Sequence, residues 1–437
     1  MNAEAAILKV PYYTRIGASF FDKLSALIIF SVLSGLFFLS DDHRFGLVFL
    51  REGIIGLSLL TVLYFLIAKK QEMDKADWYI LILTALSFIM PPIFAYLHFH
   101  QPLPLGLLEE RRTLLYLTYF LGILYLSNKK YSEDDFSLIL KSLFYLGLLW
   151  SIANAYGIIP RNAGFSFSVH AEQFGEGFVS ADARYETRFM EGGFLLSLYP
   201  YFLLARGQFK KTIIPVIFLI FYMAFINQTR GIALAIVLNF VFISFLRHRV
   251  EKNNISLALL IPTVFTLGYF AYFLYAYSIG KGVFFYDDYR NLEMNLFMRE
   301  IFNNMFLPHG AVSLQFNGGF FSIYGINAYI SDVGLVGLLF KYGLLVIPFA
   351  IIYVMLIMFL NKKYNNTFSI IILALMLTKF ITLPFGDFLG RGIEEFAVLM
   401  ILVRLQGDTY ANKYIARVRR RWTSRPSNAF DEANANA

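Results

Sequence analysis

The stretch Ile226–Leu234 has the sequence INQTRGIAL and joins two long apolar segments of the chain. No charged residue occurs in the range 213–225 before it, and none follows Arg230 until Arg247. Two uninterrupted apolar segments joined by a short polar turn predict a hairpin of two helices. Arg230 and Gly231 lie at the tip of this hairpin, and the rest of the sequence indicates which side of a membrane the tip faces.

The apolar character extends along the whole chain of 437 residues. Hydrophobic residues make up 58% of the sequence and charged residues only 16%, which is more apolar surface than a soluble protein of this length can bury. A net charge of +8 is typical of basic cytoplasmic loops and does not indicate a nucleic-acid partner. The absence of cysteine excludes disulfides and thiolate metal ligands. We therefore predict an all-α polytopic membrane protein surrounded by membrane lipids.

About twelve apolar segments approach the length of a transmembrane helix, although several are short. They lie at 20–39, 45–67, 78–98, 113–126, 136–157, 192–205, 212–227, 231–246, 255–278, 333–360, 366–384 and 393–405. Basic residues mark every second connection, at Lys69–Lys70, Lys129–Lys130, Arg206 with Lys210–Lys211, Arg247–Arg249 and Lys362–Lys363. Because cytoplasmic loops are rich in lysine and arginine, this phase predicts that both termini are cytoplasmic.

The same topology places two long connections, 158–191 and 279–332, on the outer side of the membrane, together with the tip at Arg230. Phe302, Met305 and Phe306 are spaced three and four residues apart, which predicts a short amphipathic helix over 291–307 at the outer interface. We predict a transmembrane domain over 1–405, and a basic, partly disordered cytoplasmic tail over 406–437 that suits an anionic lipid surface.

No nucleotide-binding loop or hydrolase motif occurs, and the six histidines show no metal-ligand spacing, so no metal or cofactor is expected. We interpret His98 and His100 as interfacial side chains. A transporter and an enzyme at the outer face remain as function classes. Transporters keep charges near the bilayer midplane, whereas here the charges outside the basic connections collect at the outer helix ends. They are Arg51, Glu52, Glu109 to Arg112, Arg184, Arg188, Glu191, Arg230, Asp332, Lys379, Asp387, Arg391, Glu394 and Glu395.

Lys341 is the exception to this pattern. It lies deep if 333–360 is one straight helix, and returns to the interface if 329–340 is a shallow or re-entrant segment. The charge pattern as a whole favours an interfacial enzyme. Arginine matches phosphate geometry and aromatic side chains stack on sugars, which points to a lipid diphosphate that carries a sugar. For each member of the EERR stretch at 109–112, a surface ion pair is the better interpretation, whereas Arg230 has no acidic neighbour within twenty residues.

Several segments resemble the O-antigen ligase and polymerase (Wzy) superfamily. NQTRGIALAIVL at 227–238 resembles its S/T-R-G segment, and Arg299 and Gly310 have the Arg-x(10)-Gly spacing of Wzy polymerases. The stretch 324–345 resembles the H/D-N-x-Y-L…E-x-G signature, and 188–203 resembles the end of the first large polymerase loop. Ile326 stands where ligases carry a histidine, and the first loop, 158–191, lacks the Arg-x(10)-Gly spacing.

The resemblance implies a GT-C-like membrane enzyme of the bacterial inner membrane with an active site that faces the periplasm. Its expected reaction is inverting, metal-independent polymerisation of undecaprenyl-diphosphate-linked oligosaccharide repeat units, which serve as donor and acceptor. A flippase and a chain-length-regulating co-polymerase are its expected partners. An O-antigen ligase that transfers glycan to lipid A core, and a transporter of polysaccharide or lipid-linked sugar, remain as alternatives.

This interpretation assigns roles to particular residues. Arg230 and Arg299 are the expected catalytic cations, because the diphosphate gains charge as the glycosidic bond breaks. Glu191, His309 and Asp332 are candidates for the base, with Asp332 equally suited to capping the helix that starts at Gly334. The expected substrate-binding residues are Arg188, Arg290, Asp287, Asp288, Tyr289, Asn327 and Tyr329.

Overall fold

The computed structural model describes residues 17–37, 50–155, 193–223, 230–249, 288–313, 315–326, 328–383 and 392–407, with scattered positions between 264 and 279 and Leu389. Every regular element in these ranges is a helix, and the one extended pairing among them is an isolated bridge between Gly17 and Lys130. The predicted all-α class is therefore confirmed for the described part of the chain.

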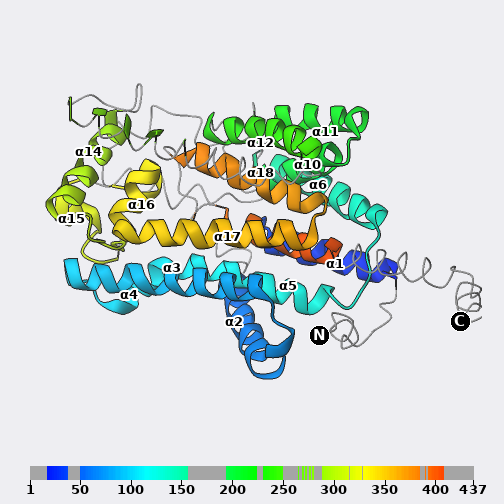
Figure 1. Ribbon diagram of the computed structural model, residues 1–437, viewed down its shortest axis with the longest axis horizontal. Coiled ribbons are helices and arrows are strands. Elements are labelled where there is room, and N and C mark those ends of the chain that lie inside the picture. The colour runs from blue at the N-terminus through cyan, green and yellow to red at the C-terminus, as the bar shows by residue number, and fades with distance from the viewer. Residues whose placement is uncertain are drawn as a thin grey trace, which may run out of the picture.

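Long helices lie side by side along the longest axis of the molecule (Figure 1). α3 packs against α17, α17 against α18, α18 against α12, α12 against α10, α10 against α6 and α6 against α1. Their bounds are α1 Phe20–Leu33, α3 Lys75–Phe99, α6 Glu133–Ala155, α10 Gly193–Ala205, α12 Arg230–Arg249, α17 Val346–Tyr364 and α18 Thr367–Ile381. A further helix covers 393–407, α11 (Phe209–Phe221) lies beside α10, and α2 (Leu50–Ala68) packs against α5 (Thr118–Leu126).

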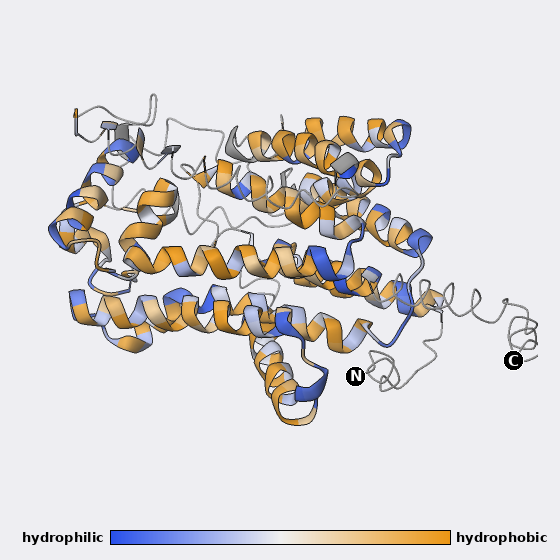
Figure 2. Ribbon diagram, in the orientation of Figure 1, coloured by the Kyte–Doolittle hydropathy of each residue, from blue (hydrophilic) through white to orange (hydrophobic). Residues whose placement is uncertain are grey.

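Four helical stretches among the described residues are long and apolar enough to cross a membrane. They are Leu50–Ala68, Lys75–Phe99, Glu133–Ala153 and Gly334–Tyr364, and shorter apolar helices occur at Phe194–Ala205, Ala233–Arg247 and Thr367–Ile381. Figure 2 shows that the helices are apolar along most of their length, with hydrophilic residues near their ends. The fold is therefore compatible with a membrane protein, whereas the number of about twelve spans stays a prediction.

Ion pairs join the helix ends at which the described basic residues gather, which we call the basic end of the bundle. Lys23 pairs with Asp135 at 2.6 Å between α1 and α6, and Arg206 pairs with Glu133 at 2.7 Å between α10 and α6. Lys363, at the C-terminus of α17, pairs with Asp74. The helix ends at the basic end are thus tied to one another by charge as well as by apolar packing.

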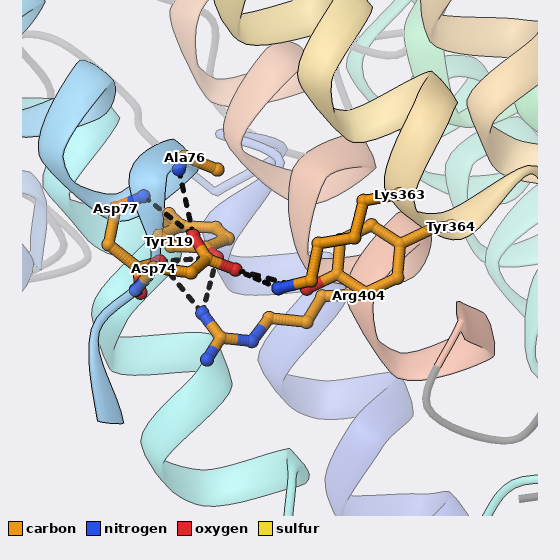
Figure 3. Close-up of polar contacts among 7 residues, drawn as sticks. All are labelled: Asp74, Ala76, Asp77, Tyr119, Lys363, Tyr364 and Arg404. Carbon is orange, nitrogen blue, oxygen red and sulfur yellow. Dashed lines mark hydrogen bonds and ion pairs between the residues drawn. The ribbon is translucent and has the colours of Figure 1, made fainter. Parts of the chain in front are cut away.

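Figure 3 shows the most buried of these charge clusters. Asp77 is 1% exposed and accepts hydrogen bonds from the hydroxyl of Tyr119 at 2.8 Å and from Nη1 of Arg404 at 2.7 Å. Asp74 caps α3 by accepting from the backbone N–H of Asp77 and also accepts from Lys363. Buried charges are costly unless they are paired and hydrogen-bonded, and here each has a partner from another helix. The cluster therefore fastens α3, α5, α17 and the helix over 393–407 together.

The opposite end of the bundle is built around α14 (Asp288–Asn303), and we call it the α14 end (Figure 1). It also contains α4 (Leu103–Glu110), η4 (Arg111–Leu117), α15 (Phe320–Tyr324), η7 (Ile330–Val333) and α16 (Gly334–Tyr342). α14 packs against α16 and η7, and it buries Met294, Phe297, Met298 and Ile301. The helix expected over 291–307 is present as α14, but it ends at Asn303, so Met305 and Phe306 of the expected apolar face lie beyond it. Met305 lies beyond the helix end in a left-handed conformation and is 85% exposed.

The segment 333–360 is not one straight helix. α16 ends at Tyr342, Gly343 adopts a φ of +57°, and α17 begins at Val346 after the short turn η8 (Gly343–Leu345). Lys341 lies beside α4, where its Nζ is 2.6 Å from Oε1 of Glu110, and both side chains are largely buried. The break lies at Gly343, two residues beyond Lys341, so Lys341 itself belongs to α16 and its depth in a membrane stays a prediction.

Glycine permits the close backbone contacts on which the α14 end depends. Gly310 has a φ of +85°, and a Cβ there would overlap the carbonyl oxygen of Pro91 and the amide nitrogen of Ala95 in α3. Gly318 has a nearly identical φ of +84°, but a Cβ there would meet nothing within 4 Å. A substitution at Gly318 therefore measures the cost of the left-handed backbone alone. The same substitution at Gly310 adds the cost of a clash with α3.

We predict that Gly310→Ala destabilises the protein more than Gly318→Ala does. Both variants incur about 1–2 kcal/mol for a left-handed alanine, whereas Gly310→Ala adds overpacking, which typically costs about 1–3 kcal/mol. Thermal unfolding of the purified protein in one detergent, followed by intrinsic fluorescence, measures the difference. Equal melting temperatures for the two variants would show that the segment around Gly310 does not pack closely on α3.

Candidate functional site

A cluster of histidine, charged and aromatic side chains lies at the α14 end, and we call it the histidine cluster. Its members come from the C-terminus of α3, from α14 and the turn after it, from the following extended segment, from α15 and from α16. They are His98, Phe99, Arg299, Glu300, Asn304, His309, Tyr324 and Phe340. Two of the residues predicted as catalytic, Arg299 and His309, are among them.

The extended segment over 308–313 is held on both sides by hydrogen bonds. The backbone N–H of His309 donates to the carbonyl of Phe340 at 2.9 Å, which fastens the segment to α16. The Gln101 amide donates to the carbonyl of Ala311 at 3.3 Å and accepts from the N–H of Ser313 at 2.8 Å. Gln101 follows α3 in sequence and is fully buried, so the segment is held between α3 and α16. This arrangement fixes the position of the His309 side chain.

His309 is 0% exposed and is held by three neighbours. Its ring stacks on Phe340 with centroids 4.4 Å apart, and its Nε2 lies 2.8 Å from the amide nitrogen of Asn304. That amide also donates to the carbonyl of Glu300, so the amide nitrogen acts as a donor and Nε2 of His309 as the acceptor. The proton of the neutral ring then lies on Nδ1, which is buried and has no hydrogen-bond partner among the described residues. Burial and the neighbouring His98 lower the pKa of His309 to about 4, so the ring is neutral at pH 7.

His98 is the exposed partner of this imidazole pair. It lies in the last turn of α3, and its ring meets that of His309 edge-on, with centroids 4.3 Å apart. The ring of Phe99 packs against it at 4.6 Å, and the Glu300 carboxylate is close enough to interact with it electrostatically. From the sequence, His98 is expected to be an interfacial side chain, and no local pattern indicates its contact with His309.

Arg299 and Glu300 form an ion pair, and the Glu300 carboxylate also interacts electrostatically with His98. Nε of Arg299 is 3.4 Å from Oε1 of Glu300, and the Arg299 side chain is 59% exposed whereas that of Glu300 is 17% exposed. Burial and the Glu300 carboxylate raise the pKa of the Tyr324 phenol, which therefore remains a hydrogen-bond donor near neutral pH. The pairing is loose and open to solvent, so the Arg299 guanidinium retains donors that can bind an external anion.

The other predicted site residues lie in different positions. The backbone N–H of Tyr329 donates to Oε1 of the buried Glu293 at 2.8 Å, which joins η7 to α14. Arg290 lies half-buried in the first turns of α14. Glu191, Arg188, Asp287 and Asn327 lie outside the described residues. The side chains of Arg230, Asp288, Tyr289 and Asp332 also lie outside the description, although their backbones belong to α12, α14 and η7.

Three residues of the stretch at 109–112 form ion pairs, of which the pair of Glu110 is largely buried and not at the surface. Glu110 pairs with Lys341, Arg111 with Glu52 at 3.5 Å, and Arg112 with Glu394 at 3.0 Å. These pairs connect α4 and η4 to α16, α2 and the helix over 393–407. These charged side chains have a structural role, because each pair connects two helices. The histidine cluster is therefore the better candidate for a catalytic or binding site.

The chemistry available to the histidine cluster is anion binding and proton transfer. An exposed guanidinium binds phosphate, an exposed imidazole beside a carboxylate accepts a proton, and aromatic side chains contact sugar rings. Across the described ranges, no three histidine, aspartate or glutamate side chains converge in a way that could hold a metal ion. Comparison with models of protein families gives no match. Comparison with curated proteins and with solved structures likewise gives no match.

We predict that His309 makes the stability of the protein depend on pH. In the unfolded chain its imidazole takes up a proton as the pH falls below about 6.5, whereas the folded protein resists protonation until about pH 4. Protonation of this imidazole therefore stabilises the unfolded state as the pH falls from about 6.5 to about 4. At pH 4 it lowers the free energy of unfolding by about 3 kcal/mol. Among its neighbours, His98 is the titratable group that acts on His309 through its charge.

The His309→Gln variant isolates this contribution, because glutamine does not titrate. Unfolding free energies of the wild type and the variant are measured by denaturant titration in one detergent at several values of pH from 7.5 to 4. We expect the difference between the two proteins to change in favour of the variant as the pH falls. A difference that is constant across the window would contradict the burial of a neutral imidazole.

Proposed function

We propose that this protein is a polysaccharide polymerase of the Wzy type, which joins undecaprenyl-diphosphate-linked repeat units. The observation that carries the proposal is the exposed Arg299 guanidinium paired with Glu300, a carboxylate that also interacts with the exposed His98 imidazole at the α14 end. The resemblance of Arg299 and Gly310 to the Arg-x(10)-Gly spacing supports it independently. Gly310 lies next to His309 in the extended segment and packs against α3. Arg299 and Gly310, the two residues of the motif, therefore both belong to the α14 end.

The topology that we propose is inferred from the connections that are rich in lysine and arginine, which we assign to the cytoplasm. About twelve spans cross a bacterial inner membrane, both termini are cytoplasmic, and the α14 end faces the periplasm. The gathering of the described basic residues at the opposite end of the bundle supports this orientation. On this orientation the diphosphate headgroup of a lipid lies at the level of the histidine cluster while its prenyl chain lies along the apolar helices.

The proposed reaction needs a cation for the leaving group and a base for the acceptor. The acceptor hydroxyl oxygen attacks the anomeric carbon of the donor sugar, and the bond from that carbon to the diphosphate oxygen breaks with its electron pair left on the diphosphate. Arg299, and Arg230 from the hairpin tip, stabilise that charge. The two carbohydrate chains are joined with inversion at the anomeric carbon, and lipid diphosphate is released.

We predict that the purified protein in nanodiscs extends lipid-linked repeat units into a ladder of products. The substrate is the repeat unit extracted from source cells that lack this protein, and the products are resolved by gel electrophoresis. Arg299→Ala should lower the rate about 10²–10³-fold, because a fixed donor to the leaving group is lost. Arg206→Ala, which removes an ion-paired arginine at the basic end, is the matched control and should retain activity.

Each other outcome of this assay identifies a different function. Transfer of glycan to lipid A core without a ladder would make the protein a ligase. Movement of the lipid-linked unit across a proteoliposome membrane without polymer growth would make it a transporter. Full activity of the Arg299→Ala variant would remove Arg299 from the reaction and leave Arg230 to be tested in the same way.

A further inference from the structure

The exposed histidine at the end of α3 has a role that the motifs of the sequence do not indicate. We propose that His98 is the general base of the polymerase, and that the buried His309 is a positioning residue beneath it. The proposal rests on the proposed function, since it assigns the proton of the acceptor hydroxyl in that reaction. It replaces His309 as the candidate base, because a fully buried ring cannot contact a sugar hydroxyl.

The first argument is access. His309 is covered by Phe340 on one ring face and meets the ring of His98 at 4.3 Å, whereas the side chain of His98 is exposed at the last turn of α3. An acceptor hydroxyl can therefore reach a ring nitrogen of His98 without any rearrangement of the fold. A general base must be within hydrogen-bond reach of the proton that it removes.

The second argument is the charge around the ring. Glu300 from α14 interacts with His98 and stabilises the imidazolium that forms when the ring takes up a proton. Arg299 is the neighbour of Glu300 in α14 and its side chain is 59% exposed, so it can bind the diphosphate while Glu300 interacts with the imidazole. Glu300 therefore connects the proposed base on α3 with the leaving-group cation on α14, because it interacts with His98 and pairs with Arg299.

The third argument is how the ring is held. Phe99 contacts the ring of His98 at 4.6 Å, and His309 contacts it at 4.3 Å. His309 is in turn fixed by Asn304, by its stacking on Phe340 and by the segment over 308–313. A neutral imidazole underneath His98 supplies a rigid support without a second positive charge, which would oppose protonation of the base.

The proposed proton transfer is balanced. As the acceptor oxygen bonds to the anomeric carbon, its hydroxyl proton moves to an unprotonated ring nitrogen of His98. The diphosphate leaves with the electron pair of the broken bond. The imidazolium then releases its proton to water at the exposed surface, which restores the neutral base for the next repeat unit.

The test uses the nanodisc ladder assay with the extracted repeat unit as substrate. His98→Gln should lower kcat about 10²–10⁴-fold with little change in KM, because proton transfer is lost while lipid binding is retained. The wild-type rate should rise with pH through the titration of an imidazole, and the variant should lack that rise. Imidazole added to His98→Ala should restore part of the activity, which a purely structural role would not allow.

His100→Asn is the matched control, because it removes an exposed histidine two residues away. His100 has a φ of +57° at the C-terminal cap of α3, a conformation that asparagine tolerates, so the helix end is preserved. This control should be as active as the wild type. If the wild type makes a ladder and His98→Gln is equally active, or if imidazole fails to rescue His98→Ala, the role of His98 is excluded and the polymerase proposal stands. If the wild type makes no ladder, the polymerase proposal itself fails.

Discussion

The arrangement of the α14 end depends on the close approach of three backbones around Gly310 and Gly343. Gly310 rests against the backbone of α3, and a Cβ at Gly343 would overlap the carbonyl of Phe306 and the backbone nitrogen of Pro308. Since Gly343 is also where α16 separates from α17, the interruption of that helix and the seating of the segment over 308–313 share one cause. Larger residues at these positions would move α16 away from α3 and remove the support of His309.

This packing creates a difference between two histidines that are far apart in the sequence. His309 loses contact with water and becomes a neutral packing group, whereas His98 keeps its exposure and gains a carboxylate neighbour in Glu300. Glu110 and Lys341, both largely buried, pair with each other at this end of the bundle, and Arg112 pairs with Glu394. Arg299 and His98 are both exposed, and Glu300 connects them, since it pairs with Arg299 and interacts electrostatically with His98.

Hydrophobic periodicity predicts the positions of the helices well but not the site. Segments such as 78–98 and 366–384 correspond closely to α3 and α18, because long apolar runs favour helices in any tertiary context. The sequence also identifies Lys341 as exceptional among the charges, and the structure places it in α16, two residues before the break at Gly343, where it pairs with Glu110. It fails at α14, where the left-handed turn at Met305 and Phe306 ends the helix before the predicted apolar face is complete. The pairing of His98 with His309 depends entirely on tertiary packing, so no local pattern could indicate it.

Photocrosslinking of the lipid substrate tests the central claim, that the sugar diphosphate binds at the histidine cluster. Tyr324 lies half-buried within the cluster, whereas Tyr125 is 64% exposed near the end of α5, towards the basic end. With p-benzoylphenylalanine placed at either position, irradiation in the presence of radiolabelled lipid-linked repeat unit should label the protein from position 324 and not from position 125. The labelling should be lost when Arg299 is replaced by alanine. Equal labelling from both positions, or none from position 324, would contradict the placement of the substrate.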